Sequence, residues 1–257
     1  MILFIFEGNR REPLLFDSIQ RLFFPRDTDT IVCSFGNNIY ELYRQMNELG
    51  GDGDVVSILR EKYNGKEDNP FKDIEASSDF AEIYLFFDYD FHNENYPLDK
   101  LNEQLGKMLE LFDNETDRGK LYINYPMVES IRYTKQLPDK DFWTYTLSRD
   151  ECRDFKRLAG DFSAYGNLDF ICIPSHREPT KNEINKAKDN WYFLKEQNVC
   201  KANYICSGLN RIPDNPDCIS QNKVFNGQKV GYVNSDVPKV SILNAFPLFL
   251  YEYFGHI

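Results

Sequence analysis

The sequence predicts an α/β fold, with a mainly parallel sheet flanked by helices and a helix-rich C-terminal part. Over residues 1–135, patterns typical of strands alternate with patterns typical of helices. Some strand patterns are continuous apolar runs, as in strands that are covered on both faces. Right-handed crossovers between such elements give a parallel sheet. Residues 136–257 are mostly helical in pattern, and we expect this region to pack on an α/β unit formed by residues 1–135.

The first half of the α/β unit contains two strands and three helices. Proline marks both ends of the first helix, because a proline is harmless in the first turn and stops a helix later on. Paired glycines end the second helix. In chain order, we expect a strand at residues 2–6, a helix between Pro13 and Pro25, a strand at 30–35, a helix from Ile39 to the Gly50-Gly51 pair and a short helix from Asp54.

The second half begins with a polar, turn-rich loop at residues 64–79. The run IYLFFDYD from Ile83 is apolar until it ends in acid, which predicts a strand buried on both faces. Apolar residues between Leu98 and Phe112 recur every three or four positions, which predicts an amphipathic helix. Residues 121–125 then predict a fourth strand.

The C-terminal region is predicted to consist mainly of helices. The apolar stretch LNAFPLFLYEYF near its end is interpreted as a core or subunit-packing helix, although it also suits docking to a partner. We expect helices over residues 150–158, 182–206 and 240–254, a short strand at 169–175 (DFICIPS), and loops at 213–218 (PDNPDC) and 226–229 (NGQK).

The composition narrows the class of protein. Hydrophobic residues make up 42% of the chain, unlike in disordered proteins. No apolar run reaches the roughly 18 residues of a membrane span, so we expect no membrane association. With six cysteines, no CxxC pair and no secretory leader pattern, we expect reduced thiols and a cytoplasmic location. The net charge of −11 counts against coating nucleic acid by charge alone, but it is compatible with an enzyme that contacts phosphate through a bound cation.

Carboxylates follow three of the predicted strands. Glu7 follows the first, Asp88 and Asp90 follow the third, and Glu129 comes just after the fourth. Because the carboxyl ends of parallel strands lie at one edge of a sheet, where ligands bind, we expect these acids to converge. Converging carboxylates repel each other unless a cation compensates them. Oxygen ligands of this kind suit Mg²⁺ or Mn²⁺.

The same residues resemble the Toprim domain, the metal-binding α/β module of topoisomerases, primases and several nucleases. The segments EGNRREP, with Glu7, Gly8, Glu12 and Pro13, and FFDYD look like its acidic motifs. They are most similar to the RloB-like and OLD-like groups of bacterial Toprim proteins, which are largely associated with defence against phage. The segment NYPMVESI is similar to the Asn-Pro-x-x-Glu segment of those proteins, with Tyr125 as an extra residue.

This resemblance implies a Toprim (Rossmann-like) fold for the α/β unit and a Mg²⁺- or Mn²⁺-dependent endonuclease that hydrolyses phosphodiester bonds. It implies that Asp88 and Asp90 bind the metal, and that Glu7 ligates a metal or acts as general base. Glu12 would hold a second metal or orient the site. It also implies the effector of a bacterial anti-phage system that acts with an ATPase partner. The catalytic set is thus Glu7, Glu12, Asp88 and Asp90, and the metal set is Glu7, Asp88, Asp90 and Glu129.

Three basic residues are candidates for binding a nucleic acid substrate. Arg10 and Arg11 lie in the predicted loop after the first strand, where a guanidinium can hold a phosphate in a bidentate manner. They are explained equally well as solvated loop arginines. Lys120, just before the fourth strand, is a weaker candidate. His92 is interpreted as a surface histidine rather than a proton shuttle.

Other functions stay open at this stage. Any one of the acids alone would be read as a solvated residue or a helix cap, and only their joint pattern favours a site. The chain is alternatively a catalytically latent interaction subunit of an ATPase-containing complex, which its acidic surface suits, or a housekeeping RNA-processing Toprim nuclease. The sequence leaves open whether the substrate is DNA or RNA, whether one or two metals bind, and whether the chain forms a homo-oligomer.

Overall fold

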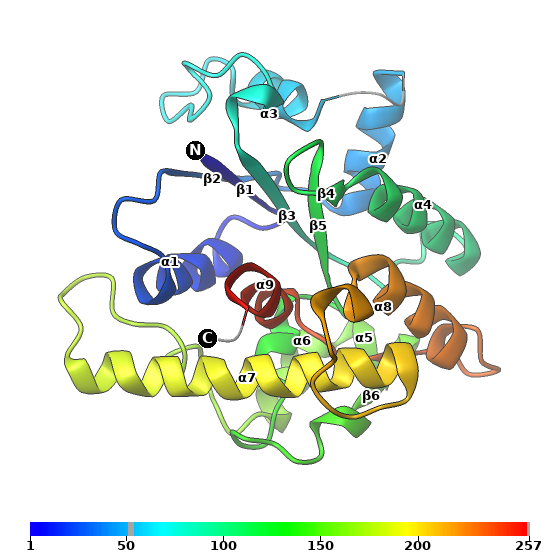
Figure 1. Ribbon diagram of the computed structural model, residues 1–257. Helices are drawn as coiled ribbons and strands as arrows, with labels where there is room; N and C mark the ends of the chain where they lie inside the picture. Colours follow the sequence, from blue (N-terminus) through cyan, green and yellow to red (C-terminus); the bar gives the residue numbers. More distant parts are fainter. Residues whose placement is uncertain (51–53, 256–257) are drawn as a thin grey trace.

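The computed structural model describes residues 1–50 and 54–255 of the chain. Its main sheet has the strand order β2-β1-β3-β5-β4 and is flanked by helices (Figure 1). Strands β1, β2, β3 and β5 are parallel, and the short β4 pairs antiparallel with β5. The predicted α/β class with a mainly parallel sheet is therefore confirmed. The strands are β1 (Ile2–Phe6), β2 (Thr30–Ser34), β3 (Glu82–Asp88), β4 (Asp113–Asn114) and β5 (Gly119–Asn124).

The helices of the α/β unit begin and end close to the predicted positions. Asn38 caps α2 by accepting a hydrogen bond from the Glu41 N–H, and Asp54 caps α3 by accepting one from the Val56 N–H. The predicted glycine end of the second helix falls partly outside the described residues, because Gly51 is not among them. These helices are α1 (Arg11–Phe23), α2 (Ile39–Glu48), α3 (Val55–Tyr63) and α4 (Leu98–Leu111).

The C-terminal region adds helices and a small second sheet. Strands β6 (Thr146–Ser148) and β7 (Lys239–Ser241) pair antiparallel, and neither was predicted. The helices are α5 (Arg149–Arg153), α6 (Phe155–Phe162), α7 (Lys181–Ser207), α8 (Gln221–Gln228) and α9 (Ala245–Phe254), with a π-helical turn η5 (Lys229–Val233). Short 3-10 turns are η1 (Ser77–Asp79), η2 (Val128–Arg132), η3 (Phe142–Thr144) and η4 (Pro216–Ile219).

The strand order places a topological switch point between β1 and β3. The chain leaves β1 through α1 to reach β2 on one side, and then returns past β1 to β3 and onward to β5. Helix α1 covers one face of the sheet, whereas α2, α3 and α4 cover the other (Figure 1). In open parallel sheets, ligands bind beyond the carboxyl ends of the strands at such a switch point. The carboxyl ends of β1 and β3 are therefore the place to look for a site.

Helix α9 is a core helix between the sheet and α7 (Figure 1). Its Phe246 ring stacks on Phe86 of β3 with centroids 4.7 Å apart, and Phe249 lies edge-on to Tyr84 at 5.1 Å. Because it is covered on two sides, the helix is apolar nearly all round. Of the two interpretations of LNAFPLFLYEYF, packing in the core is the one that the structure bears out. None of the described helices combines the length and the apolar character that crossing a membrane requires.

Two predictions for the segments around α7 need correction. Residues 150–158 form parts of two short helices, α5 and α6, rather than one. Residues 169–175 form turns and not a strand, because side chains satisfy the backbone there. The Ile171 carbonyl accepts hydrogen bonds from Ser18 Oγ (3.0 Å) and from Trp191 Nε1 (2.9 Å). These bonds fix the segment against both α1 and α7.

Two further predictions near the C-terminus were also wrong. Residues 226–229 lie in α8 and the turn after it, not in a loop. Gly227 suggested a turn, but a Cβ atom there would lie 2.5 Å from the Ile205 carbonyl oxygen, so this glycine permits close packing of α8 on α7. Residues 240–244 are not helical: β7 ends there, and Asn244 caps α9 by accepting a hydrogen bond from the Phe246 N–H at 3.1 Å.

Candidate functional site

Glu7 and Glu12 are positioned by the turn between β1 and α1. Glu7 extends the sheet by one residue, since its N–H donates to the Phe86 carbonyl at 3.0 Å. Glu12 is buried in the first turn of α1, and its Oε1 accepts a hydrogen bond from the Gly8 N–H at 3.0 Å. A Cβ atom at position 8 would lie 2.7 Å from Glu12 Oε2. The glycine therefore leaves room for this carboxylate.

Asp88 ends β3 next to Glu7, as the strand order requires. Its backbone N–H donates to Glu7 Oε2 at 2.9 Å. Its register partner on β5, Asn124, donates from Nδ2 to Asp88 Oδ1 at 3.0 Å. Asn124 Oδ1 in turn accepts from the Ala245 N–H at the start of α9, also at 3.0 Å. Asn124 thus holds the Asp88 carboxylate in place and couples it to the core helix.

Asp90 follows in an unusual backbone conformation. Its φ of +51° lies in the left-handed region, which few residues other than glycine adopt and in which Asp and Asn are the most tolerated. The Asp90 carbonyl accepts a hydrogen bond from the Asn93 N–H at 2.7 Å, which closes a tight turn. Conformations of this kind concentrate at functional sites. The turn keeps Asp90 at the carboxyl edge of the sheet.

The carboxyl groups of Glu7, Glu12, Asp88 and Asp90 lie in an environment that disfavours their ionisation. Burial, and then the charge of Asp90, raises the pKa of Glu7 well above its ordinary value. Burial, and then the charges of Glu7, Glu12 and Asp90, does the same for the pKa of Asp88. The pKa of Glu12 and that of Asp90 are also raised, mainly by burial. None of the four carboxylates forms an ion pair with a described residue, and the charges of Arg11, His92 and Lys156 offset the effect of burial only in part.

Glu129 lies close to Glu12 but has cationic partners. It is buried in η2, and its Oε1 lies 2.5 Å from an Arg11 guanidinium nitrogen and 3.8 Å from Lys156 Nζ. The charge of Glu129 contributes to the raised pKa of Glu12. Its other oxygen, Oε2, is buried and has no hydrogen-bond partner within the described ranges. Glu129 therefore lies with the other acids at the carboxyl edge of the sheet, and its Oε2 has no protein partner among the described residues that would prevent it from contacting a ligand.

The predicted substrate-binding residues separate into two groups. Arg10 is exposed and Arg11 half-buried, and both lie at the start of α1 beside the acids. Lys120 lies at the other end of β5, four residues before Asn124, which corresponds to about 13 Å along a strand. Its ammonium group pairs with Glu252 and lies 3.5 Å from Glu115. The structure does not bring Lys120 to the acidic edge.

Three residues near the acids were missed by sequence reasoning. Asn124 stands within the NYPMVESI segment, so its position was a usable signal. His92 is half-buried, so it is partly at the surface as predicted, but its Nδ1 is buried and has no hydrogen-bond partner among the described residues. The charges of His92 and Lys156 act against burial on the pKa of Asp90. Lys156 comes from α6, and only the tertiary fold brings it there.

The donor set of this edge suits a hard cation. It consists of carboxylate oxygens, which Mg²⁺ and Mn²⁺ prefer, and it includes the orphaned oxygen of Glu129. Across residues 1–50 and 54–255, no three or more His, Cys, Asp or Glu side chains are arranged so that together they would hold a metal ion. Mg²⁺ requires only one or two carboxylates and keeps several waters. The residues are therefore compatible with Mg²⁺, and the metal site stays a prediction.

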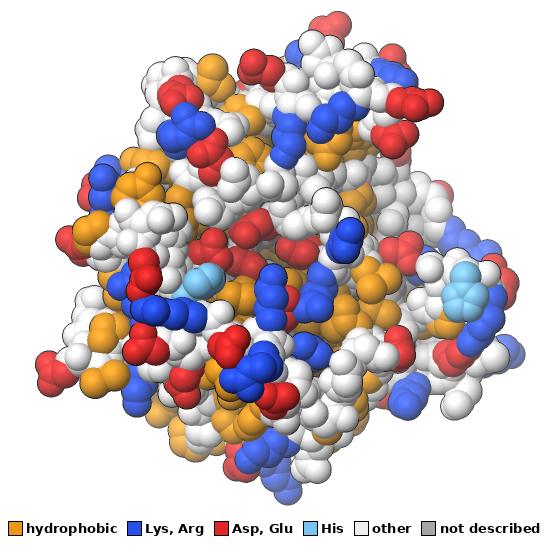
Figure 2. Space-filling view, turned by 180° about the vertical axis from the view of Figure 1, so that it is seen from behind, with side chains coloured by type: hydrophobic (Ala, Val, Ile, Leu, Met, Phe, Trp, Pro, Cys, Tyr) orange, Lys and Arg blue, Asp and Glu red, His pale blue; other side chains and the backbone are white. Residues whose placement is uncertain are grey.

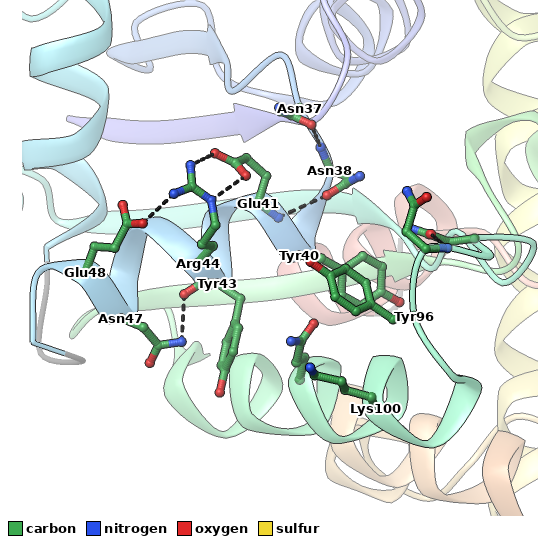
Figure 3. A pocket seen from close by; sticks show the side chains of 13 residues that line it. Asn37, Asn38, Tyr40, Glu41, Tyr43, Arg44, Asn47, Glu48, Tyr96 and Lys100 are labelled. Atoms are coloured by element: carbon green, nitrogen blue, oxygen red, sulfur yellow. Dashed lines mark hydrogen bonds and ion pairs between the residues drawn. The ribbon is translucent and has the colours of Figure 1, made fainter.

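Two cavities open near the same edge of the sheet. One, of about 490 Å³, lies between α2 and α4 and is lined mainly by carboxamides, tyrosines and charged side chains (Figure 3). In it, the Arg44 guanidinium pairs with both Glu41 and Glu48. The other, of about 860 Å³, begins at Arg10 and Arg11 and is lined largely by the segment before α7. Figure 2 shows a hollowed face on which acidic side chains gather next to Lys and Arg side chains.

All six cysteines are free, as the expectation of reduced thiols requires. Comparison with family models, with curated proteins and with solved structures gives no match to this chain.

Proposed function

We propose that this chain is a divalent-metal-dependent nuclease that hydrolyses phosphodiester bonds at the carboxyl edge of β1 and β3. One observation carries the proposal: Glu7, Glu12, Asp88 and Asp90 meet at the topological switch point with raised pKa values and without an ion pair to any described residue. A protein maintains such a cluster against the repulsion and desolvation that it entails only if something uses it. The order of these acids along the chain, which resembles the Toprim motifs, supports the same function.

The residues at this edge would have different roles in the reaction. Asp88, Asp90, Glu7 and Glu129 are the carboxylates that would hold Mg²⁺ or Mn²⁺. When bound, the ion supplies Lewis-acid stabilisation of negative charge on the phosphoryl oxygens. Instead of holding the ion, Glu7 would alternatively act as general base toward water, since burial and the charge of Asp90 raise its pKa and so make its carboxylate a stronger base. Asn124 keeps the Asp88 carboxylate oriented through its hydrogen bond.

The wider role is proposed from the Toprim resemblance alone. On this ground, the chain is proposed to be the effector of a bacterial anti-phage system and to act in the cytoplasm with an ATPase partner. DNA and RNA are both substrates compatible with the site. On the same ground, the α/β unit, whose mainly parallel sheet flanked by helices is consistent with a Rossmann-like fold, is proposed to be a Toprim domain.

The experiment that tests the proposal is calorimetry with Mg²⁺ and Mn²⁺, run beside cleavage assays on plasmid DNA and on total tRNA. The variant is Asp88→Asn/Asp90→Asn, which keeps side-chain size and removes two charges. The matched control is Asp68→Asn/Asp73→Asn, which removes the same charge from an exposed loop. We expect wild type and control to bind metal and cleave, and the variant to do neither.

Other results would redirect the proposal. Metal binding by the wild type without cleavage of either substrate would favour the latent interaction subunit, whose activity awaits a partner. Cleavage of tRNA alone would favour an RNA-processing nuclease. If the wild type binds neither ion and cleaves nothing, the metal-dependent nuclease is wrong.

A further inference from the structure

We propose that the 860 Å³ groove between α1 and the start of α7 holds the phosphate groups of a single nucleic-acid strand whose scissile bond lies at the acidic edge. The inference rests on the proposed nuclease function and names the path of its substrate. The groove takes its walls from the start of α1, from η2, from the segment before α7 and from the first turns of α7. Its charged lining consists of Arg10, Arg11, Arg132, Arg177 and Lys186 against Asp169 and Glu183.

The groove is locally basic in a chain whose net charge is −11. Two of its arginines are neutralised by carboxylates, since Arg11 pairs with Glu129 and Arg177 with Glu183. The positive charges of the three other basic residues have no carboxylate partner among the residues that the structure describes. These three are Arg10, Arg132 and Lys186.

Arg132 is the fixed cation of this groove. Its guanidinium donates to the carbonyl oxygens of Gly166 and Lys156, both at 3.1 Å, so it is oriented without being neutralised. Burial, and then the charge of Arg11, lowers the pKa of Arg132, which indicates that the two guanidinium groups lie close enough to repel each other. A phosphate beside them would relieve this repulsion, and arginine binds phosphate well.

The wall of the groove that residues 169–175 form is fixed by hydrogen bonds to α1 and α7. Ser18 of α1 donates to the Ile171 carbonyl and accepts from the Ile173 N–H at 3.1 Å. Asn190 of α7 donates to the Phe170 carbonyl at 2.6 Å. The same bonds that prevent residues 169–175 from forming a strand therefore shape the groove. A preformed wall of this kind reduces the entropy lost when a ligand binds.

The groove is continuous with the acidic edge and suits a strand better than a duplex. Arg10 and Arg11 line it directly beside Glu12, and Arg11 bridges to Glu129. Its cations lie among mixed surface charge, and Figure 2 shows acidic side chains scattered over the face that it draws. A flexible strand can enter a groove of this kind, whereas the broad surface of a duplex would meet those acids.

The test measures binding in EDTA, so that no cleavage occurs. Fluorescence anisotropy is followed with labelled single strands of about 20 nucleotides, as DNA and as RNA, and with the corresponding duplexes. The variants Arg10→Gln and Lys186→Gln change exposed side chains at the two ends of the groove. We expect each to weaken single-strand binding about tenfold. Each should also make the slope of log K against log salt concentration shallower by about 0.7.

Arg44→Gln is the matched control, because it also removes one exposed arginine but lies in the other cavity, where two glutamates already neutralise it (Figure 3). We expect it to leave both affinity and salt slope unchanged. Arg132→Gln is informative only if its circular dichroism spectrum matches that of the wild type, since the hydrogen bonds of Arg132 to two carbonyl oxygens also stabilise the fold. The result of the test is therefore decided by the variants Arg10→Gln and Lys186→Gln.

Unchanged affinity and slope in both Arg10→Gln and Lys186→Gln would overturn the proposal, and so would tighter binding of the duplex than of the strand. The two proposals fail differently. If the protein cleaves but these variants do not change binding, the nuclease proposal stands and the groove proposal is wrong. If the protein binds strands through these residues but cleaves nothing with any metal, the groove proposal stands and the nuclease proposal is wrong.

Discussion

The carboxylates at the two ends of the parallel sheet differ in their partners: those at the amino end are paired with a lysine, and those at the carboxyl end form no ion pair with a described residue. At the amino end of β5, Glu252 accepts a hydrogen bond from the Tyr122 hydroxyl at 2.6 Å and pairs with Lys120, which also faces Glu115. Burial alone would lower the pKa of Lys120, but its bond to Glu252 outweighs this effect and the pKa is raised. At the carboxyl end, Asp88 and its neighbours have raised pKa values and no ion pair with a described residue.

The difference separates structural charge from functional charge. The cluster around Lys120 ties α9 to the sheet and is complete in itself, so its cation stabilises the fold. The acids at the other end are incomplete without a further positive charge. Mutations at the two ends should therefore have opposite effects. Removing a charge at the amino end should lower stability and leave activity unchanged. Removing a charge at the carboxyl end should lower activity and raise stability.

The largest expected effect is on catalysis. Asp88→Asn should reduce Mg²⁺-dependent cleavage by more than about 100-fold, because it removes a proposed ligand and not merely a residue behind one. Glu252→Gln should cleave at close to the wild-type rate. The rates are compared at saturating metal on whichever substrate the wild type cleaves. Equal losses in the two variants would erase the contrast between the ends of the sheet.

The next effect is on stability at the amino end. Lys120→Met leaves Glu252 and Glu115 without their cation in a partly buried setting, which should cost about 2 kcal/mol and lower the Tm by roughly 4–8 °C. Lys107→Met is the control, because Lys107 forms an exposed helical pair with Glu103, and exposed pairs of this kind contribute little to stability. Differential scanning calorimetry in EDTA measures both variants. A Tm for Lys120→Met equal to that of the control would contradict the structural role of the cluster.

A smaller and pH-dependent effect is expected at the carboxyl end. The pKa of Asp88 is raised in the folded protein, so the folded state binds a proton that the unfolded state, with a pKa of about 3.9, has already lost. Stability then falls as pH rises through the interval between the two pKa values. Asp88→Asn avoids this loss, and in EDTA it should be more stable than the wild type at pH 7, by roughly 2–4 °C in Tm.

The advantage of Asp88→Asn should shrink as the pH falls toward about 4 and disappear below it, where the wild-type carboxyl group is protonated in both states. Urea unfolding midpoints measured from acid to neutral pH follow the change. Saturating Mg²⁺ should stabilise the wild type at pH 7 more than it stabilises the variant. A variant that is less stable than the wild type at pH 7 would show that Asp88 is compensated after all.

Sequence reasoning predicted the acidic edge because the required information is local. A continuous apolar run such as the one before Asp88 specifies a buried strand, and parallel pairing then brings the strand ends together. The partners of the acids depend on tertiary structure instead. Lys156 reaches Glu129 only because α6 packs beside η2, and Lys120, at the amino end of β5, finds its partner Glu252 only because α9 packs on the sheet.

The wrong predictions in the C-terminal region have a related cause. Residues 169–175 have a strand-like composition, but Ser18 and Trp191, which are distant in sequence, satisfy their backbone. Gly227 looks like a turn residue and instead permits a close helix contact with Ile205. In both cases a long-range contact overrides the local preference, and such contacts cannot be read from a pattern within one segment.

The smallest expected effect on stability tests how the turn after β1 positions Glu12. The φ angle of Gly8 is not in the left-handed range, so alanine fits the backbone, but its Cβ would lie 2.7 Å from Glu12 Oε2. The Glu12 side chain is flexible and should move away, losing its hydrogen bond to the Gly8 N–H. We expect Gly8→Ala to cost under about 1 kcal/mol of stability and yet to reduce cleavage.

A double-mutant cycle separates this positioning effect from a general disturbance of the turn. If Gly8 acts by leaving room for the Glu12 carboxylate, then Gly8→Ala should reduce cleavage in the wild-type background and have almost no further effect in Glu12→Ala, where the clash is absent. Additive losses would mean that the turn itself, and not the Glu12 carboxylate, is what the glycine serves. In that case the Glu12 carboxylate would owe its place near Asp88 to the first turn of α1 and not to the glycine.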